Sequence, residues 1–297
     1  MKPPFSPVDQ PARAAIWMIG TVISFTLMAV AGREASSELD TFEILACRSL
    51  VGMLIILTIA AASGSLKELS GGGFRLHLLR NTLHFAATNL WFFAVATIPL
   101  AQVFAFEFAT PLWTALLAPL FLAERLPRSR MIATLAGFAG ILIIIRPGFI
   151  VVTPGVSAAL FCAVGFAGAA VATRKLVRIQ SVTAILFWMT CIQSVLSLLC
   201  AGIDGDIALP SARTALPLLI ISICGLTAHL CLTKALAAAS ATLVMPLDFA
   251  RLPVIALIGF FAYGEALDIF LGLGAAVILC ANYANLRLAG KSDPGIY

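Results

Sequence analysis

The chain has 297 residues, of which 61% are hydrophobic and only 11% charged, and its mean hydropathy is +1.04. A soluble domain carries about 25% charged residues, so this composition excludes an ordinary water-soluble fold. The net charge is +5, but no solvated basic patch is visible, so we expect no nucleic-acid partner.

Ten apolar stretches follow one another along the chain, and most reach the roughly 20 residues that a membrane-spanning helix needs. They are 14–33, 41–62, 78–98, 100–122, 130–145, 154–173, 182–201, 214–236, 241–263 and 268–286. The polar segment 1–13 and the segment 289–297 remain as tails, and no cleavable signal peptide is visible. The sequence therefore predicts an all-α integral membrane protein with ten transmembrane helices.

The basic residues predict the orientation of these helices. If the N-terminus is cytoplasmic, the inside segments hold Lys2, Arg13, Lys67, Arg75, Arg80, Arg125, Arg128, Arg130, Arg174, Lys175, Arg178, Arg287 and Lys291, and the outside segments hold Arg33, Arg146 and Arg213. An excess of Lys and Arg marks the cytoplasmic side. We therefore expect an inner-membrane, multi-pass protein with both termini in the cytoplasm.

The chain also repeats itself when the sequence is displaced along itself by the distance from Phe106 to Leu247, and we call this displacement the repeat shift. It carries Phe106-Glu107-Phe108-Ala109 onto Leu247-Asp248-Phe249-Ala250, and Arg33 onto Arg174. Five spans per half is an odd number, so the second half, 147–288, enters the membrane from the opposite side to the first, 14–146. Such inverted five-helix repeats are typical of secondary transporters that work by alternating access.

Two runs of residues resemble the EamA type of the drug/metabolite transporter superfamily. The first half carries Trp91-Phe92-Phe93-Ala94-Val95-Ala96, Pro99-Leu100-Ala101, Pro111-Leu112-Trp113 and Leu122-Ala123-Glu124-Arg125; the second carries Lys234-Ala235-Leu236, Ser240-Ala241-Thr242, Pro246 and Tyr263-Gly264-Glu265. The resemblance covers roughly residues 14–287. It implies a monomeric carrier with a central cavity, in which Glu124 and Glu265 are structural residues at helix ends.

A charge inside the hydrocarbon costs about 2.5–3.5 kcal/mol on insertion scales, so intramembrane charges mark candidate sites. A helix rises about 1.5 Å per residue. Counted in this way, Arg48 and Glu107 lie in the outer half of the membrane, Asp248 in the inner half and Arg251 near the middle. We expect the pairs Arg48–Glu107 and Asp248–Arg251 to bracket the cavity as gates or as solute ligands. Structural ion pairs that only hold the bundle together are the alternative.

Proline interrupts two of the predicted spans at related places. Pro111 and Pro253 each lack an N–H donor and clash with the carbonyl four residues earlier, which breaks a helix. Paired breaks in the two halves of a transporter point to its binding site, although a packing kink is the alternative. Thr110 continues the Glu107 face of its helix, and Trp113 is a candidate aromatic wall of the site.

His84 and His229 are candidates for a proton relay because histidine titrates near neutral pH. The seven cysteines all lie in apolar spans without a Cys-x-x-Cys pair, which favours small buried thiols. No His, Cys or acidic cluster has the spacing of a metal site. We therefore expect no metal, no cofactor and no enzymatic activity.

Together these patterns favour a secondary transporter for a small polar metabolite, zwitterionic or carboxylate, such as an amino acid, with membrane lipid as its other partner. A multidrug cation exporter of the same superfamily is one rival, but the small four-helix kind needs an acid in its first helix, and here that helix offers only Thr21, Ser24 and Thr26. A lipid-handling or scaffold protein is the other rival. A lipid-handling protein would need a reactive cluster nearer to one interface, whereas a scaffold would tolerate Arg251→Leu with little harm.

Overall fold

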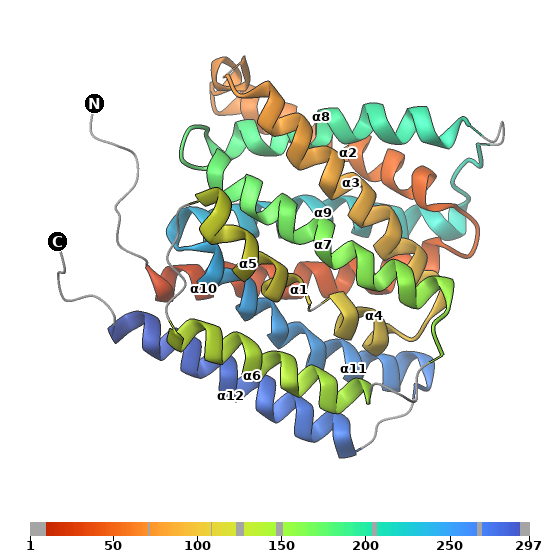
Figure 1. Cartoon of the computed structure of the whole chain (residues 1–297). Helices are drawn as coiled ribbons and strands as arrows, with labels where there is room; N and C mark the ends of the chain where they lie inside the picture. The colour runs from red at the N-terminus through yellow and green to blue at the C-terminus, as the bar shows by residue number, and fades with distance from the viewer. Residues whose placement is uncertain are drawn as a thin grey trace.

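The computed structural model describes residues 10–70, 72–107, 109–122, 128–146, 151–203, 207–265 and 269–291, and the regular secondary structure in these ranges is entirely helical (Figure 1). The α-helices are α1 (Pro11–Ala35), α2 (Thr41–Ala62), α3 (Phe74–Thr97), α4 (Leu100–Glu107), α5 (Thr110–Leu122), α6 (Arg128–Ile145), α7 (Pro154–Leu176), α8 (Val182–Ala201), α9 (Ala212–Ala238), α10 (Ala241–Leu247), α11 (Arg251–Tyr263) and α12 (Ile269–Lys291). Two 3₁₀ turns, η1 (Leu66–Ser70) and η2 (Asp248–Ala250), complete the list.

Polar caps set the start of several helices. The Asp40 carboxylate accepts from the Glu43 backbone N–H at 2.7 Å, and the Glu43 carboxylate accepts from the Asp40 N–H at 2.9 Å, which begins α2. Ser211 and Ser181 cap α9 and α8 in the same way, with side-chain oxygens that accept from N–H groups of the first turn. Each cap satisfies a donor that has no partner inside its helix.

The helices run side by side as one bundle, and in Figure 1 the beginning of α1 and the end of α12 lie at the same end of it, on the left. We call this end the terminal side and the other end the opposite side. The main pairings are α1 with α9, α3 with α7, α2 with α8, and α6 with α12. The repeat shift turns the α1–α9 pairing into the α7–α3 pairing.

Glycine allows two of these pairs to approach closely. A Cβ at Gly165 of α7 would lie 2.8 Å from the Ala87 Cβ of α3, and one at Gly140 of α6 would lie 2.8 Å from the Gly274 carbonyl of α12. Small residues bring membrane helices into van der Waals contact, which stabilises them where no hydrophobic force acts between helices.

Seven segments of the described residues are long and apolar enough to cross a membrane, against the ten that the sequence predicts. They are Pro11–Ala35, Thr41–Ala62, Leu100–Leu122, Pro154–Leu176, Val182–Ala201, Ala212–Ala238 and Ala241–Tyr263. α3 is not among them; it carries Arg75, Arg80 and two histidines. α6 and α12 contribute only the shorter apolar segments Met131–Gly140 and Gly272–Ala281. The count of ten stays a prediction.

Two of the seven segments are broken near their middle. Leu100–Leu122 is divided into α4 and α5, and Ala241–Tyr263 is divided into α10, η2 and α11. Glu107 ends α4 and Asp248 begins η2, so the breaks fall at positions that the repeat shift relates. Each break thus places an acidic side chain at the wall of the interior of the bundle.

Candidate functional site

A central cavity lies between α1, α2, α3, α7 and α9 and the two broken helices. It encloses about 760 Å³ of space, including the part continuous with the outside. Of the residues singled out from the sequence, those on the cavity wall are Arg48, His84, Glu107, Thr110, Pro111, His229, Asp248 and Arg251.

Arg251 joins the two broken helices at the cavity wall. Its Nη2 donates to a Glu107 carboxylate oxygen at 2.6 Å and to an Asp248 carboxylate oxygen at 2.6 Å. Trp91 Nε1 donates to the other Glu107 oxygen at 2.7 Å. The Arg251 guanidinium also lies over the rings of Phe25 and Phe104, at 5.1 and 4.6 Å. This buried cluster of one cation and two carboxylates has a formal charge of −1.

The expected Arg48–Glu107 pair does not form. Glu107 bonds to Arg251 and Trp91, whereas Arg48 makes no ion pair or hydrogen bond to any described residue, and its Nη1 is buried without a partner. The depth count was wrong in separating Glu107 from Asp248, because both bind one nitrogen of Arg251. That count assumed straight, continuous helices, and both helices break at these carboxylates.

Thr110 replaces a hydrogen bond that is missing at the break between α4 and α5. Pro111 cannot donate to the carbonyl of Glu107, four residues earlier, and the Thr110 hydroxyl donates to that carbonyl instead at 2.5 Å. A carbonyl left free in a lipid environment costs several kcal/mol, so the hydroxyl has a structural role here. The second break lies at η2, just before Pro253, which occupies the first turn of α11.

Trp113 does not line the cavity. Its side chain is 41% exposed on the surface of the bundle, so it forms no aromatic wall of the site. Trp113 follows Thr110 by three residues, a rotation of about 300° around α5, so its side chain points about 60° away from that of Thr110.

Four rings form a row across the cavity wall instead. Phe25 of α1 meets His229 of α9 at 5.3 Å between ring centroids, His229 meets His84 of α3 at 4.5 Å, and His84 meets Phe166 of α7 at 5.7 Å. The Gln193 side-chain nitrogen is 2.7 Å from His84 Nδ1. An amide nitrogen only donates, so His84 Nδ1 accepts and carries no proton in this arrangement.

Arg80 is a cavity residue that the sequence analysis missed. It was counted among the basic residues at the cytoplasmic ends, but its side chain is buried, with Nε donating to the Thr173 hydroxyl at 3.2 Å and Nη1 to the Asn81 side chain at 2.6 Å. The signal was present in the spacing, because His84 and Trp91 follow Arg80 at helical intervals and share one face of α3 with it.

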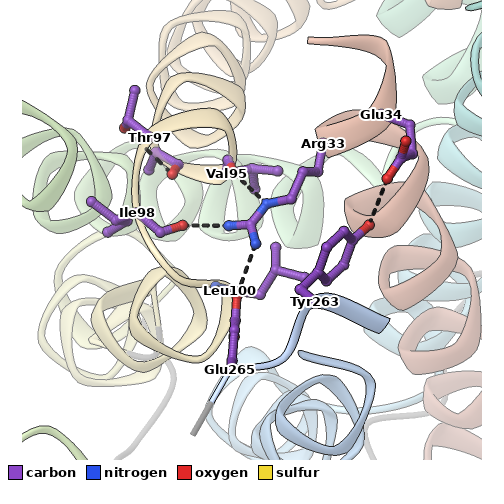
Figure 2. A network of polar contacts seen from close by, with 9 residues as sticks. Arg33, Glu34, Val95, Thr97, Ile98, Leu100, Tyr263 and Glu265 are labelled. Carbon is purple, nitrogen blue, oxygen red and sulfur yellow. Dashed lines mark hydrogen bonds and ion pairs between the residues drawn. The ribbon is translucent and has the colours of Figure 1, made fainter. Parts of the chain in front are cut away.

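Beyond the cavity, toward the opposite side, a polar network joins three helix ends (Figure 2). Arg33, near the end of α1, donates to the carbonyls of Val95 and Ile98 at the end of α3 and pairs with the Glu265 carboxylate at 2.8 Å. Glu265 also accepts from the Leu100 N–H at 3.0 Å. We call this network the Arg33 latch.

The latch has a partial counterpart at the terminal side. Arg174 of α7 donates to the Leu236 carbonyl of α9, and the repeat shift takes Arg33 and Val95 to these two residues. The residue that corresponds to Glu265 is Glu124, which lies outside the described residues. Among the residues that the structure describes, no group of three or more His, Cys, Asp or Glu side chains is placed to hold a metal ion.

Comparisons with known proteins agree with this architecture. The model of the EamA-like transporter family matches residues 12–146 and 153–286. The chain is 30% identical to a riboflavin transporter of Rhizobium johnstonii, over 94% of this chain and 93% of that protein, and 28% identical to a riboflavin transporter of Vibrio cholerae, over 91% of each. It is 24% identical to an S-adenosylmethionine uptake transporter of Rickettsia bellii, over 89% of this chain and 90% of that protein.

A solved crystal structure also shares the fold. It superimposes with a TM-score of 0.78, covers 95% of this chain and 99% of the other, and is 20% identical in sequence. At that identity the likeness concerns the fold alone.

Proposed function

Because the chain belongs to the EamA-like transporter family, which makes it a membrane transporter of small metabolites and not an enzyme, we propose that it moves a polar, zwitterionic or carboxylate solute through the central cavity by alternating access. The observation that carries the proposal is the Arg251 clamp, in which one buried guanidinium ties together two helix breaks that the repeat shift relates.

The two halves, 14–146 and 147–288, are proposed to act as inverted five-helix repeats of a ten-helix carrier. The exchange of the α1–α9 and α7–α3 pairings under the repeat shift supports this, as does the family model, which matches the chain twice. Two equivalent halves provide two conformations, one open to each side of the membrane. The excess of basic residues in the sequence segments expected to be cytoplasmic supports a cytoplasmic position for both termini in an inner membrane, and we propose that the protein acts as a monomer.

The relatives extend the range of candidate solutes. Flavins and S-adenosyl compounds join amino acids as candidates, because relatives at 24% and 30% identity carry names for S-adenosylmethionine and riboflavin transport. The row of four rings offers flat surfaces for a heterocycle. Asp248 Oδ1 is buried without a hydrogen-bond partner and offers an acceptor to an ammonium or N–H group of the solute.

The test is solute counterflow in liposomes that contain the purified protein, with labelled riboflavin, S-adenosylmethionine, amino acids and a lipophilic cation. We expect exchange of one metabolite class. Exchange of the lipophilic cation alone would favour the multidrug exporter, and exchange of none of them would favour a lipid-handling or scaffold protein.

Substitutions in the Arg251 clamp test whether it takes part in transport. Arg251→Ala leaves two buried carboxylates without their cation, and removing one partner of a buried ion pair costs about 3–5 kcal/mol. We expect this variant to lose both stability and exchange. The charge-neutral variant Glu107→Gln/Asp248→Asn/Arg251→Gln should recover the thermal stability but not the exchange. Normal exchange by that variant would contradict the role of the clamp in transport.

A further inference from the structure

Two arginines face the cavity with no acidic partner among the described residues. Arg48 of α2 is 4% exposed and Arg80 of α3 is 2% exposed, and both line the central cavity. Within the described part of the chain, neither forms an ion pair: Arg48 has no hydrogen bond there, and Arg80 bonds only to the neutral side chains of Thr173 and Asn81. Both cations lie on the wall of one cavity, and like charges repel each other more strongly in a medium of low dielectric constant than in water.

Such an arrangement is costly unless something else neutralises it. Moving a cation out of water costs several kcal/mol even after the protein relaxes, and a nearby carboxylate normally offsets this cost. The carboxylates of the cavity, Glu107 and Asp248, are already bound to Arg251. The cavity wall therefore carries two charged groups: the cluster of Arg251, Glu107 and Asp248, of formal charge −1, and the pair of Arg48 and Arg80, of formal charge +2. The row of four rings lines the same wall.

The surroundings of Arg48 are shaped around its guanidinium. A Cβ at Gly225 of α9 would lie 2.5 Å from Arg48 Nε and 3.3 Å from its Cζ, so a glycine is what leaves room for the group at this position. Arg48 also borders a smaller cavity of about 210 Å³ that Thr190, Gln193 and Ser222 help to line. Water in that cavity could hydrate one edge of Arg48 but could not cancel its charge.

We infer that Arg48 and Arg80 form an anion subsite that binds the carboxylate or phosphate group of the transported solute. The inference rests on the proposed function, since it takes the cavity as the solute site. Guanidinium groups bind carboxylate and phosphate through paired, charge-assisted hydrogen bonds, and Arg48 has its donors free for them. Arg251, which the sequence suggested for this role, already has its Nη2 bound to two carboxylates of the protein.

The experiment compares matched ligand pairs by thermal unfolding of the purified full-length protein. Riboflavin 5′-phosphate is compared with riboflavin, and S-adenosylmethionine with its decarboxylated form, with inorganic phosphate as a fifth probe. Binding to the folded state raises the melting temperature. We expect the anionic member of one pair to give the larger rise, and the phosphate and carboxylate pairs distinguish the two kinds of anion.

Variants then locate the effect. In Arg48→Gln and Arg80→Gln the preference for the anionic member should disappear, and without ligand each melting temperature should rise by about 2–4 °C, because an uncompensated charge has been removed. Gly225→Ala moves the guanidinium while keeping its charge, and should weaken the same preference. Arg213→Gln removes an exposed arginine at the start of α9 and is the matched control, with no change expected.

The failures can be told apart. Equal shifts by both members of each pair, unchanged in Arg48→Gln and Arg80→Gln, would overturn the anion subsite and leave the proposed function intact. A fall in the ligand-free melting temperature of Arg48→Gln and Arg80→Gln, with the preference kept, would make the two arginines structural. No shift with any of the five probes, together with no counterflow, would count against the proposed function itself.

Discussion

Glu107 depends on two residues from different helices, Trp91 of α3 and Arg251 of α11. Trp91 is 2% exposed, and its indole N–H is 2.7 Å from the Glu107 carboxylate. A hydrogen bond to a charged group contributes about 1.5–3 kcal/mol. Trp91 therefore stabilises the buried acid directly, in addition to its packing against Phe92 and Phe104.

The prediction for this residue concerns Trp91→Phe, which keeps an aromatic ring and removes the N–H donor. We expect the free energy of unfolding to fall by at least about 1.5 kcal/mol, measured by thermal or denaturant unfolding in detergent. Trp113→Phe is the control, because Trp113 is 41% exposed and should tolerate the change. Equal losses in the two variants would mean that the Trp91 hydrogen bond contributes nothing measurable.

Among the secondary-structure elements, the broken helices matter most for the site. Pro111 prevents a continuous helix through residues 107–110, and the chain compensates within one turn by the Thr110 hydroxyl. The sequence of the second half places Asp248 and Arg251 at the corresponding break. The breaks therefore bring both carboxylates to Arg251.

The prediction for this element is a pair of substitutions at Thr110. Thr110→Val keeps the shape but removes the hydroxyl, leaving the Glu107 carbonyl without its donor, which costs about 1–3 kcal/mol. Thr110→Ser keeps the hydroxyl and should stay near the parent stability. Melting temperatures measure the difference. If the valine and serine variants melted together, the hydroxyl would have no part in stabilising the break.

For the molecule as a whole, we propose that the Arg33 latch controls access to the cavity from the opposite side. It joins the ends of α1 and α3 to Glu265, which follows α11, and Tyr263 adds a hydrogen bond to Glu34 at 3.2 Å (Figure 2). The Arg33 and Glu265 side chains are 19% and 16% exposed, so solvent weakens the pair only in part. In the proposed transport cycle, the latch would have to separate for the cavity to open to this side.

The corresponding prediction uses Glu265→Gln in a protein whose seven native cysteines are replaced and which carries Met28→Cys, at a cavity position on the part of α1 nearer the latch. Losing about 1 kcal/mol of pairing should shift the population toward the open form by about fivefold. Labelling of the introduced thiol by an impermeant maleimide should rise by that factor. Glu34→Gln, which keeps the Arg33–Glu265 pair, is the control, and an equal rise there would contradict the latch.

Composition, the internal repeat and proline are enough to predict the solvent of this protein, its helical class and the residues at which two helices break, and the runs that resemble EamA proteins predict its family. Each of these signals acts within a few residues along the chain or is visible by comparing the chain with itself. The transporter family and the all-helical architecture are confirmed, while ten spans, the inverted repeat and the site residues remain predictions.

Which charges meet depends instead on the tertiary structure. Arg251 pairs with Glu107 from another helix, and Arg48 has no acidic partner among the residues that the structure describes. Arg80 turns into the cavity while Trp113 turns away. An ion pair depends on which helices pack together and on how each helix is rotated about its own axis. That rotation decides whether a given side chain faces the lipid or the cavity. Neither quantity is encoded in the local pattern of one helix, because both result from the packing of all of them.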